Sequence, residues 1–220
     1  MHFGAIICSL GARYKQYCSN IIRTLLVDPT QEQKDLYQFL LSLEEEIINK
    51  LQDGVKLSEV YQHAVDYVEK KDKNLVEKMT KNLGFVMGIE FREGSLAIVP
   101  KSNSTAKKGM TFNIAVGFSG LENKEAQDSD GKIYALFLGD TVMVNAGASA
   151  TVLTQSKKRL KSIAFIIKDD KDEESEEEKV KEKKKKSDKK KNDILDDLGR
   201  GRRTTVLENK LRVSCSFYSL

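Results

Sequence analysis

The stretch N-L-G-F-V-M-G-I-E-F-R-E-G-S-L-A-I, residues 82–98, decides the fold. Three glycines, Gly84, Gly88 and Gly94, divide it at short intervals. Gly84 stands where a helix is expected to end, because glycine readily adopts the left-handed conformation found at helix C-termini. Residues 89–93 are expected to run extended. The stretch therefore predicts the end of a helix, a glycine turn and then a strand.

The composition is that of a globular protein with one sizeable core. The chain has 220 residues, of which 40% are apolar and 32% are charged, and this length is enough for one domain. The net charge of +4 is small for this length, so no strong overall field for nucleic acid is expected. Three irregularly spaced cysteines argue against a disulfide framework, and no apolar run approaches the roughly 20 residues that span a bilayer.

The first half of the chain alternates between strand and helix patterns. Two or three short strands with a turn near Gly11 are expected over residues 3–27. Thr30 and Gln33 then have the spacing of a capping box, which predicts a helix from residue 30 to about residue 53. A second helix is expected from Ser58 to about Lys70, and a shorter third one should carry Leu75, Met79 and Leu83.

A two-residue period appears after residue 109. Apolar side chains alternate with small or polar ones over residues 110–118, which predicts a strand with one apolar and one small, polar face. Further strands are expected at 132–138, 141–145, 151–154 and 162–167. The order of strands, helices and strands predicts an α+β domain with a largely antiparallel sheet, over residues 1–167.

The composition changes abruptly after residue 167. Residues 169–178 contain eight acidic residues, and a lysine-rich block follows. Such a tract cannot bury a core, so residues 168–192 are interpreted as a disordered charged linker and 193–220 as a tail that begins a following domain. A candidate nuclear localisation signal consists of Lys183, Lys184, Lys185, Lys186, Lys189, Lys190 and Lys191. The alternative is a solvated linker whose acidic and basic blocks pair with each other.

The glycine frame of residues 84–93 resembles a motif of the pita-bread metallopeptidases, G-H-G-I-G-L-E-x-H-E. Gly84, Gly88, Glu90 and Glu93 keep that frame. Residues 9–24, S-L-G-A-R-Y-K-Q-Y-C-S-N-I-I-R-T, likewise resemble the strand D-x-G-x-x-Y-x-G-Y-x-S-D-x-T-R-T. Two later strands resemble motifs that carry the remaining glutamate ligands of these enzymes.

The resemblance implies five metal-ligand positions, and none of them holds a ligand here. They are Ser9, Asn20, Phe85, Ala115 and Gly139. In addition, Arg92 stands at the position of a second, substrate-side histidine. Two hard divalent cations need several carboxylates to offset their charge and to form the hydroxide nucleophile. The resemblance therefore implies a protein without metal, cofactor or catalytic residue, and not an enzyme.

A more specific resemblance covers residues 11–203. The runs G-A-R-Y-K-x-Y-C-S-N, K-N-L-G-F-x-M-G-I-E-F-R-E-G-S-L and Y-A-L-F-x-G-D-T-V are similar to the aminopeptidase-like domain in the large subunit of FACT histone chaperones. This implies a pita-bread fold with a curved sheet and covering helices, whose N-terminal part is absent here. It also implies a non-catalytic module for histones or peptides, acting in nucleosome reorganisation during transcription, replication and repair.

The same resemblance sets the expected partners and location. Core histones and the HMG-box subunit of FACT are the expected partners, with nucleic acid bound only weakly or indirectly and no membrane, in the nucleus and on the chromosome. Candidate peptide-binding residues are Glu90 and Glu93, which could meet a basic tail, and Arg23 and Arg92, which could orient a carbonyl or carboxylate. The alternative for these charges is a set of internal salt bridges.

Three other functions stay open at this point. A ligand-free pita-bread protein that binds nucleic acid would rely on the lysine block and on Arg200–Arg203. A peptidase with weak residual activity would need a metal. A truncated product could be non-functional or could compete with a longer subunit.

Overall fold

The computed structural model describes residues 4–126 and 131–167, which belong to one compact unit of residues 1–167. The charged linker, the tail and the lysine cluster predicted above lie outside the described residues. The helices are α1 Gln31–Lys50, α2 Leu57–Lys71, α3 Lys73–Lys78 and α4 Leu160–Ile163. The strands are β1 Ala5–Tyr14, β2 Tyr17–Val27, β3 Gly84–Met87, β4 Thr111–Glu122, β5 Ile133–Met143, β6 Thr151–Val152 and β7 Ala164–Phe165.

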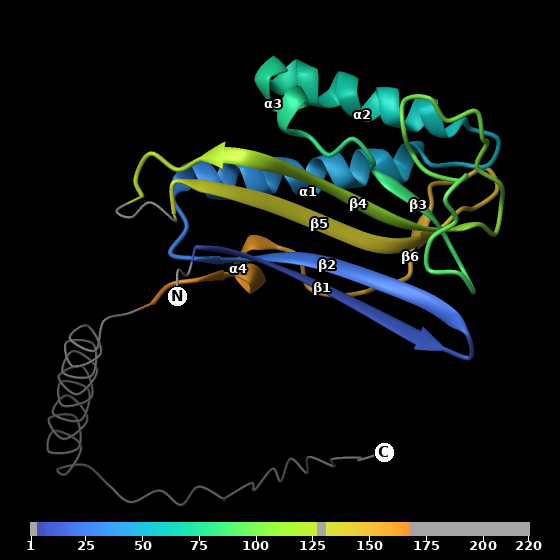
Figure 1. The fold of residues 1–220 in the computed structure, drawn as a ribbon, viewed down its shortest axis with the longest axis horizontal. Helices are drawn as coiled ribbons and strands as arrows, with labels where there is room; N and C mark the ends of the chain where they lie inside the picture. The colour runs from blue at the N-terminus through green and yellow to red at the C-terminus, as the bar shows by residue number, and fades with distance from the viewer. Residues whose placement is uncertain (1–3, 127–130, 168–220) are drawn as a thin grey trace, which may run out of the picture. The chain divides into compact units, whose positions relative to one another are not determined.

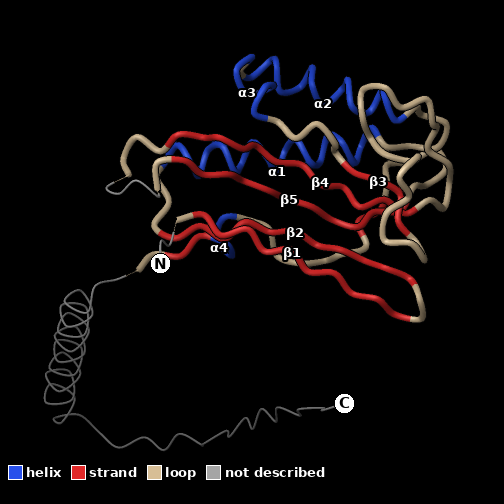
Figure 2. Tube along the Cα trace, in the orientation of Figure 1, coloured by secondary structure: helices blue, strands red, loops and turns tan. Residues whose placement is uncertain are grey.

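A single sheet of seven strands organises the described residues (Figure 1). Its main order is β1-β2-β5-β4-β3, with β6 paired to β5 and β7 to β2. Every pairing is antiparallel except that of β7 with β2. Figure 2 shows the β1–β2 hairpin at the edge of the sheet away from α2 and α3. This arrangement confirms the predicted α+β class and its largely antiparallel sheet.

The helix α1 supplies the main apolar face that covers the sheet. Its capping box is present, since Gln33 N donates to Thr30 Oγ1 over 3.3 Å and Thr30 N donates to Gln33 Oε1 over 3.0 Å. The buried face of α1 packs against β4 and β5, and α2 packs on α1. The predicted helix ended three residues too late, and Ser58 does not cap the second helix, whose N-cap is Lys56 without a side-chain bond.

The opening stretch folds differently from the prediction. Gly84 begins β3 instead of ending a helix, and the third helix has already ended at Lys78. A Cβ on Gly84 would lie 2.4 Å from the Asn113 carbonyl oxygen, so glycine is required by close strand pairing. Residues 89–93 form a loop, because the chain turns back and Glu93 N donates to the Val86 carbonyl over 2.9 Å.

Three strand predictions also need correction. Residues 5–27 make one long hairpin, because the turn lies at Lys15 and Gln16, which both have positive φ, as two-residue hairpin turns require. Gly11 is inside β1, opposite Asn20. Residues 132–145 contain the single strand β5 instead of two, and the last predicted strand is the short helix α4 followed by two residues of β7.

Candidate functional site

The strand register brings together the five residues that the family resemblance predicts to be vacated ligand positions. A first row crosses four strands: Ser9 of β1 pairs with Ile22 of β2, Ile22 with Gly139 of β5, and Gly139 with Ala115 of β4. The row follows directly from the pairing of neighbouring strands. Three of the five positions therefore lie along one line across the sheet.

A second row, two residues further along each strand, holds the other two positions. Asn20 N donates to Thr141 Oγ1 over 2.9 Å, Thr141 pairs with Asn113, and Asn113 pairs with Phe85 of β3. The Asn20 side chain also links the rows, since Ser9 Oγ donates to Asn20 Oδ1 over 3.4 Å. Since residues two apart on a strand share a face, both rows point to the same side of the sheet.

A pocket of about 310 Å³ opens beside these rows. Its lining consists of Asn20, Ile22, Asn82, Gly84, Phe85, Phe91, Asn113, Ala115 and Phe137. Three vacated positions line it, and Ser9 and Gly139 adjoin it in the first row. Residues 110–118 were predicted to form a strand with one small, polar face. Asn113 and Ala115 on that face line this pocket, whose other walls are mainly apolar.

The residues present do not fit the two-metal centre that the fold implies. No carboxylate, imidazole or thiol lines the pocket, and within residues 4–126 and 131–167 no three His, Cys, Asp or Glu side chains cluster as metal ligands would. At Gly139 a Cβ would lie 2.6 Å from the Ile114 carbonyl oxygen and 3.2 Å from Ile22 Cδ1. Backbone therefore fills the space that a ligand side chain would need.

One wall of the pocket is the loop of residues 88–95. The tip of the β1–β2 hairpin holds this loop, since Arg13 Nη2 donates to the Ile89 carbonyl over 2.9 Å and Cys18 N donates to the Gly88 carbonyl over 2.8 Å. Phe91 on the loop meets Phe85 edge to face, with ring centroids 5.6 Å apart. The loop thus closes the pocket on the β3 side.

The charged candidates on this loop are at the surface. Arg92 stacks over the Phe85 ring at 5.2 Å from its centroid. Glu90 and Glu93 are exposed, and among the described residues neither makes a salt bridge. All three side chains are therefore accessible to a ligand at the rim of the pocket.

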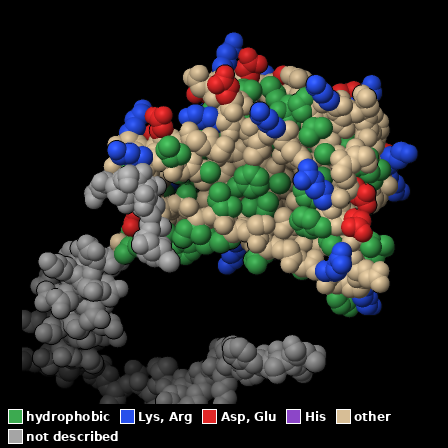
Figure 3. All heavy atoms as spheres, viewed as in Figure 1, with side chains coloured by type: hydrophobic (Ala, Val, Ile, Leu, Met, Phe, Trp, Pro, Cys, Tyr) green, Lys and Arg blue, Asp and Glu red, His purple; other side chains and the backbone are tan. Residues whose placement is uncertain are grey.

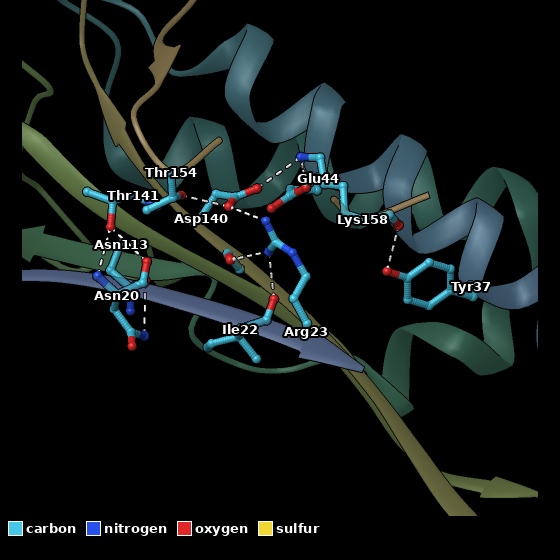
Figure 4. Close-up of polar contacts among 11 residues, drawn as sticks. Asn20, Ile22, Arg23, Tyr37, Glu44, Asn113, Asp140, Thr141, Thr154 and Lys158 are labelled. Atoms are coloured by element: carbon cyan, nitrogen blue, oxygen red, sulfur yellow. Dashed lines mark hydrogen bonds and ion pairs between the residues drawn. The ribbon is translucent and has the colours of Figure 1, made fainter. Parts of the chain in front are cut away.

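Arg23 differs from the other candidates because it points to the opposite face of the sheet (Figure 4). Its side chain is buried, with Nη2 2.7 Å from Asp140 Oδ1 and Nη1 donating to the Gly139 carbonyl over 2.8 Å. Arg23 follows Ile22, and alternate strand residues face opposite sides. It therefore forms an internal salt bridge and is not available to a peptide in the pocket.

The Arg23–Asp140 pair belongs to a buried polar network. Lys158 Nζ lies 3.0 Å from Asp140 Oδ2 and 2.6 Å from Glu44 Oε2 on α1 (Figure 4). Thr154 Oγ1 donates to Asp140 Oδ1 over 2.7 Å. The network ties β2, β5, α1 and the segment 154–158 together.

Burial and charge act against each other in this network. Burial raises the pKa of Glu44 to about 7, and the attraction of Lys158 offsets only part of this effect. Partial burial disfavours the Lys158 ammonium, but the carboxylates of Glu44 and Asp140 outweigh it and raise the pKa of Lys158. Lys158 is therefore charged at neutral pH, whereas the pKa of the Glu44 carboxyl is about 7.

Sequence reasoning missed this network and part of the pocket. Glu44 lies four residues from both Leu40 and Ile48 on the apolar face of α1. A charged residue within this apolar face was the sequence signal that could have indicated a buried ion pair. Asn113 and Phe137 belong to strands that were predicted, but they line the same pocket only because β4 pairs with β5. In that pairing Asn113 lies opposite Thr141, 28 positions away, and no local pattern predicts which residues face each other.

The antiparallel sheet and its covering helices define the class as a pita-bread fold, and no carboxylate, imidazole or thiol lines the pocket on its face. Residues 3–146 match the model of metallopeptidase family M24. The chain belongs to this family.

Within the family the chain is similar to large subunits of the FACT complex. It is 41% identical over 174 residues to FACT complex subunit SPT16 of Dictyostelium discoideum, a match covering 78% of this chain and 16% of the relative. The corresponding subunit of Arabidopsis thaliana is 40% identical over 168 residues, with coverages of 76% and 16%. The chain thus spans about a sixth of the length of these relatives.

Solved structures agree with this assignment. The N-terminal domain of SPT16 from chickpea superposes with a TM-score of 0.68 at 42% identity, covering 73% of this chain and 38% of that one. An X-Pro aminopeptidase from Thermotoga maritima superposes with a TM-score of 0.60 at 21% identity, covering 74% and 42%. The peptidase likeness is one of fold alone, whereas the likeness to the SPT16 domain extends to sequence.

Proposed function

We propose that this chain is a non-catalytic, histone- or peptide-binding module of a FACT-type histone chaperone, acting in nucleosome reorganisation during transcription, replication and repair. The relatives that share about two-fifths of its residues are named as FACT complex subunits. The observation that supports the proposal is the pocket lined by Asn20, Phe85 and Ala115, three residues that the family resemblance predicts to be vacated ligand positions. Its walls are apolar and amide groups, which suit the binding of a peptide but not its hydrolysis.

The absence of catalysis is part of this proposal. Ser9, Asn20, Phe85, Ala115 and Gly139 supply neither a charge-balanced metal site nor a general base. We expect the purified chain to hold no stoichiometric cobalt, manganese or zinc by elemental analysis. Metal-dependent release of N-terminal residues from peptides would contradict the proposal.

Core histones are the proposed ligands, with the HMG-box subunit of FACT as a further proposed partner. The exposed carboxylates of Glu90 and Glu93 stand beside the pocket without a salt bridge among the described residues. Histone tails are basic, so these two carboxylates would attract them. The proposed location is the nucleus and the chromosome, and nucleic acid contact would be weak or indirect.

In Figure 3 hydrophobic side chains gather over the middle of the sheet while charged ones lie around them.

The experiment that tests this function is a pull-down of core histones by the full chain at increasing salt. We expect association at about 50–100 mM salt that weakens as the Debye length falls below about 10 Å. Replacing Glu90 and Glu93 by glutamine should reduce it. The matched control replaces Glu45 and Glu77, two exposed acids on helices away from the pocket, and should leave it unchanged.

The pull-down has a clear negative outcome. If no histone is retained at low salt, or if both double variants behave alike, the chain does not bind histones through this surface.

A further inference from the structure

The pocket beside the vacated positions has walls made chiefly of aromatic and aliphatic groups. Phe85, Phe91 and Phe137 contribute three phenyl rings, and Ile22 and Ala115 add aliphatic groups to the lining. Phe91 is 45% exposed and the other two rings are half-buried. Such a surface gains free energy when an apolar group replaces water. The pocket is therefore suited to an uncharged side chain.

A cationic side chain is disfavoured inside this pocket. No acidic residue lines it, so a buried ammonium or guanidinium would lose its hydration without a counter-charge. A cation could otherwise bind on an aromatic face, but Arg92 already stacks over Phe85 at 5.2 Å from the ring centroid. Glu90 and Glu93 are exposed on the rim loop and can hold only a charge that stays outside.

One polar group in the pocket has an unused hydrogen-bond donor. Asn113 is 2% exposed, and its Oδ1 accepts from Asn20 Nδ2 over 3.5 Å. Its Nδ2 has no hydrogen-bond partner within the described part of the chain, although the residue lines the pocket. Nδ2 is not one of the fully buried, unpartnered side-chain atoms of the described residues, so it faces the open pocket and can exchange water for a ligand. A carbonyl oxygen of a ligand would satisfy this donor.

Resting on the peptide-binding function proposed above, we infer that the pocket accepts the aliphatic side chain of an extended peptide while Asn113 Nδ2 donates to a main-chain carbonyl of that peptide. Basic residues of the same peptide then lie outside the pocket, beside Glu90 and Glu93. The vacated metal site has thus become a pocket that selects by apolar shape and one amide contact.

The test uses three small compounds and the full chain labelled with nitrogen-15. N-acetyl-leucinamide carries both groups that the pocket recognises, N-acetyl-lysinamide replaces the aliphatic end by a cation, and N-acetyl-glycinamide has no side chain. We expect the leucine compound to shift the Asn113 side-chain amide resonance saturably. The other two should bind roughly tenfold or more weakly, because a pocket discriminates strongly against an unfilled or charged alternative.

Two variants and a control locate the binding. Ala115→Leu enlarges a side chain that lines the pocket, and Phe91→Ser removes a lining ring that lies on an exposed loop outside the core. Each should weaken the leucine compound by about tenfold or more. Ala148→Leu makes the same change as the first variant at an exposed loop residue and should leave binding unchanged. Unfolding curves of the three variants identify any loss of fold.

Three results would overturn the inference: equal affinities for the leucine and lysine compounds, no change at the Asn113 amide, or undiminished binding by a folded Phe91→Ser variant. These compounds contain no histone, so the outcome is independent of the pull-down. Binding of the leucine compound without histone association would defeat only the proposed function. Histone association without selectivity for leucine would defeat only the present inference.

Discussion

At position 139 the sheet has no room for a side chain. A Cβ there would lie 2.6 Å from the Ile114 carbonyl oxygen. This oxygen is a backbone atom, so it cannot move away from the clash as the end of a flexible side chain could. We therefore expect Gly139→Ala to lower the free energy of unfolding by about 1–3 kcal/mol, as overpacking of a core does. Chemical denaturation followed by circular dichroism measures this change.

Gly94 offers the matched control for this prediction. It lies in the rim loop with no atom within 4 Å of an added Cβ, so Gly94→Ala should change stability by less than about 0.5 kcal/mol. Equal effects of the two alanines would show that β4 and β5 can separate at Gly139. In that case, restoring a ligand at this position would be sterically possible.

We expect Glu44 to make the stability of the folded chain depend on pH. Burial raises its pKa to about 7, whereas the unfolded chain has an ordinary pKa near 4.5. Between these values the folded state binds the proton that the unfolded state releases. Stability therefore falls as the pH rises from about 4.5 to about 7, by on the order of 1 kcal/mol per pH unit for this group.

Glu44→Gln removes this titration while keeping the size and an oxygen that can accept from Lys158. The expected result is a flatter dependence of unfolding free energy on pH between about 5 and 7 than in the unchanged chain. Denaturation series at several pH values measure both curves. Glu45→Gln, at the exposed neighbour, should reproduce the unchanged curve, and parallel curves for all three proteins would show that Glu44 does not titrate in this range.

The elements differ in how far local sequence determines them. The helix α1 was predictable because its capping box and apolar spacing are local features. The β1–β2 hairpin was misread because Lys15 and Gln16 form its turn, without the Asn-Gly or Gly pair that usually marks one. Gly84 was misread as a helix end because the contact that requires it, with Asn113 on β4, is 29 positions away in the chain.

For the candidate site, motif resemblance supplies a set of residues but not their arrangement. Resemblance to peptidase motifs identified the vacated positions, and the strand register then brought them together. Arg23 was the wrong choice for a ligand contact because the motif gives no information about the side of the sheet on which a residue lies. The face was fixed by the pairing of Ile22 with Gly139, which depends on the whole sheet.

Two threonines join the hairpin to the rest of the sheet. Thr24 Oγ1 donates to the Phe137 carbonyl and accepts from Phe137 N, both over 2.8 Å. Thr141 Oγ1 makes the same pair of bonds with Asn20, over 2.8 and 2.9 Å. Ile22 and Gly139 form the only ladder pair between β2 and β5 in the described part of the sheet. The β2–β5 seam therefore depends on side-chain hydroxyls.

Replacing either threonine by valine keeps the shape and removes both bonds. We expect Thr24→Val and Thr141→Val each to cost about 1–3 kcal/mol, because each leaves a buried N–H and a carbonyl without a partner. Hydrogen exchange should also accelerate at Phe137 N and Asn20 N respectively. Thr111→Val on β4, where the hydroxyl makes no hydrogen bond among the described residues, is the control, and exchange unchanged at the seam would contradict the prediction.

On the scale of the described molecule, one buried network connects the hairpin to the helical layer. Arg23 comes from β2, Asp140 from β5 and Glu44 from α1, and Lys158 joins the last two. The apolar core is also continuous from α2 through α1 to the sheet. Because no element is held by local contacts alone, the described unit is expected to unfold in one cooperative transition.

Asp140→Asn tests this cooperativity at the centre of the network. It keeps the shape but leaves the buried charge of Arg23 and part of that of Lys158 without compensation, which costs about 3–5 kcal/mol. If the unit is cooperative, hydrogen exchange in mild denaturant will accelerate by the same factor for slowly exchanging amides in the β1–β2 hairpin, α1 and β4. If exchange accelerates at the hairpin amides while those of α1 and β4 stay protected, the hairpin opens separately. The side of the pocket formed by Asn20 and Ile22 of β2 would then be movable.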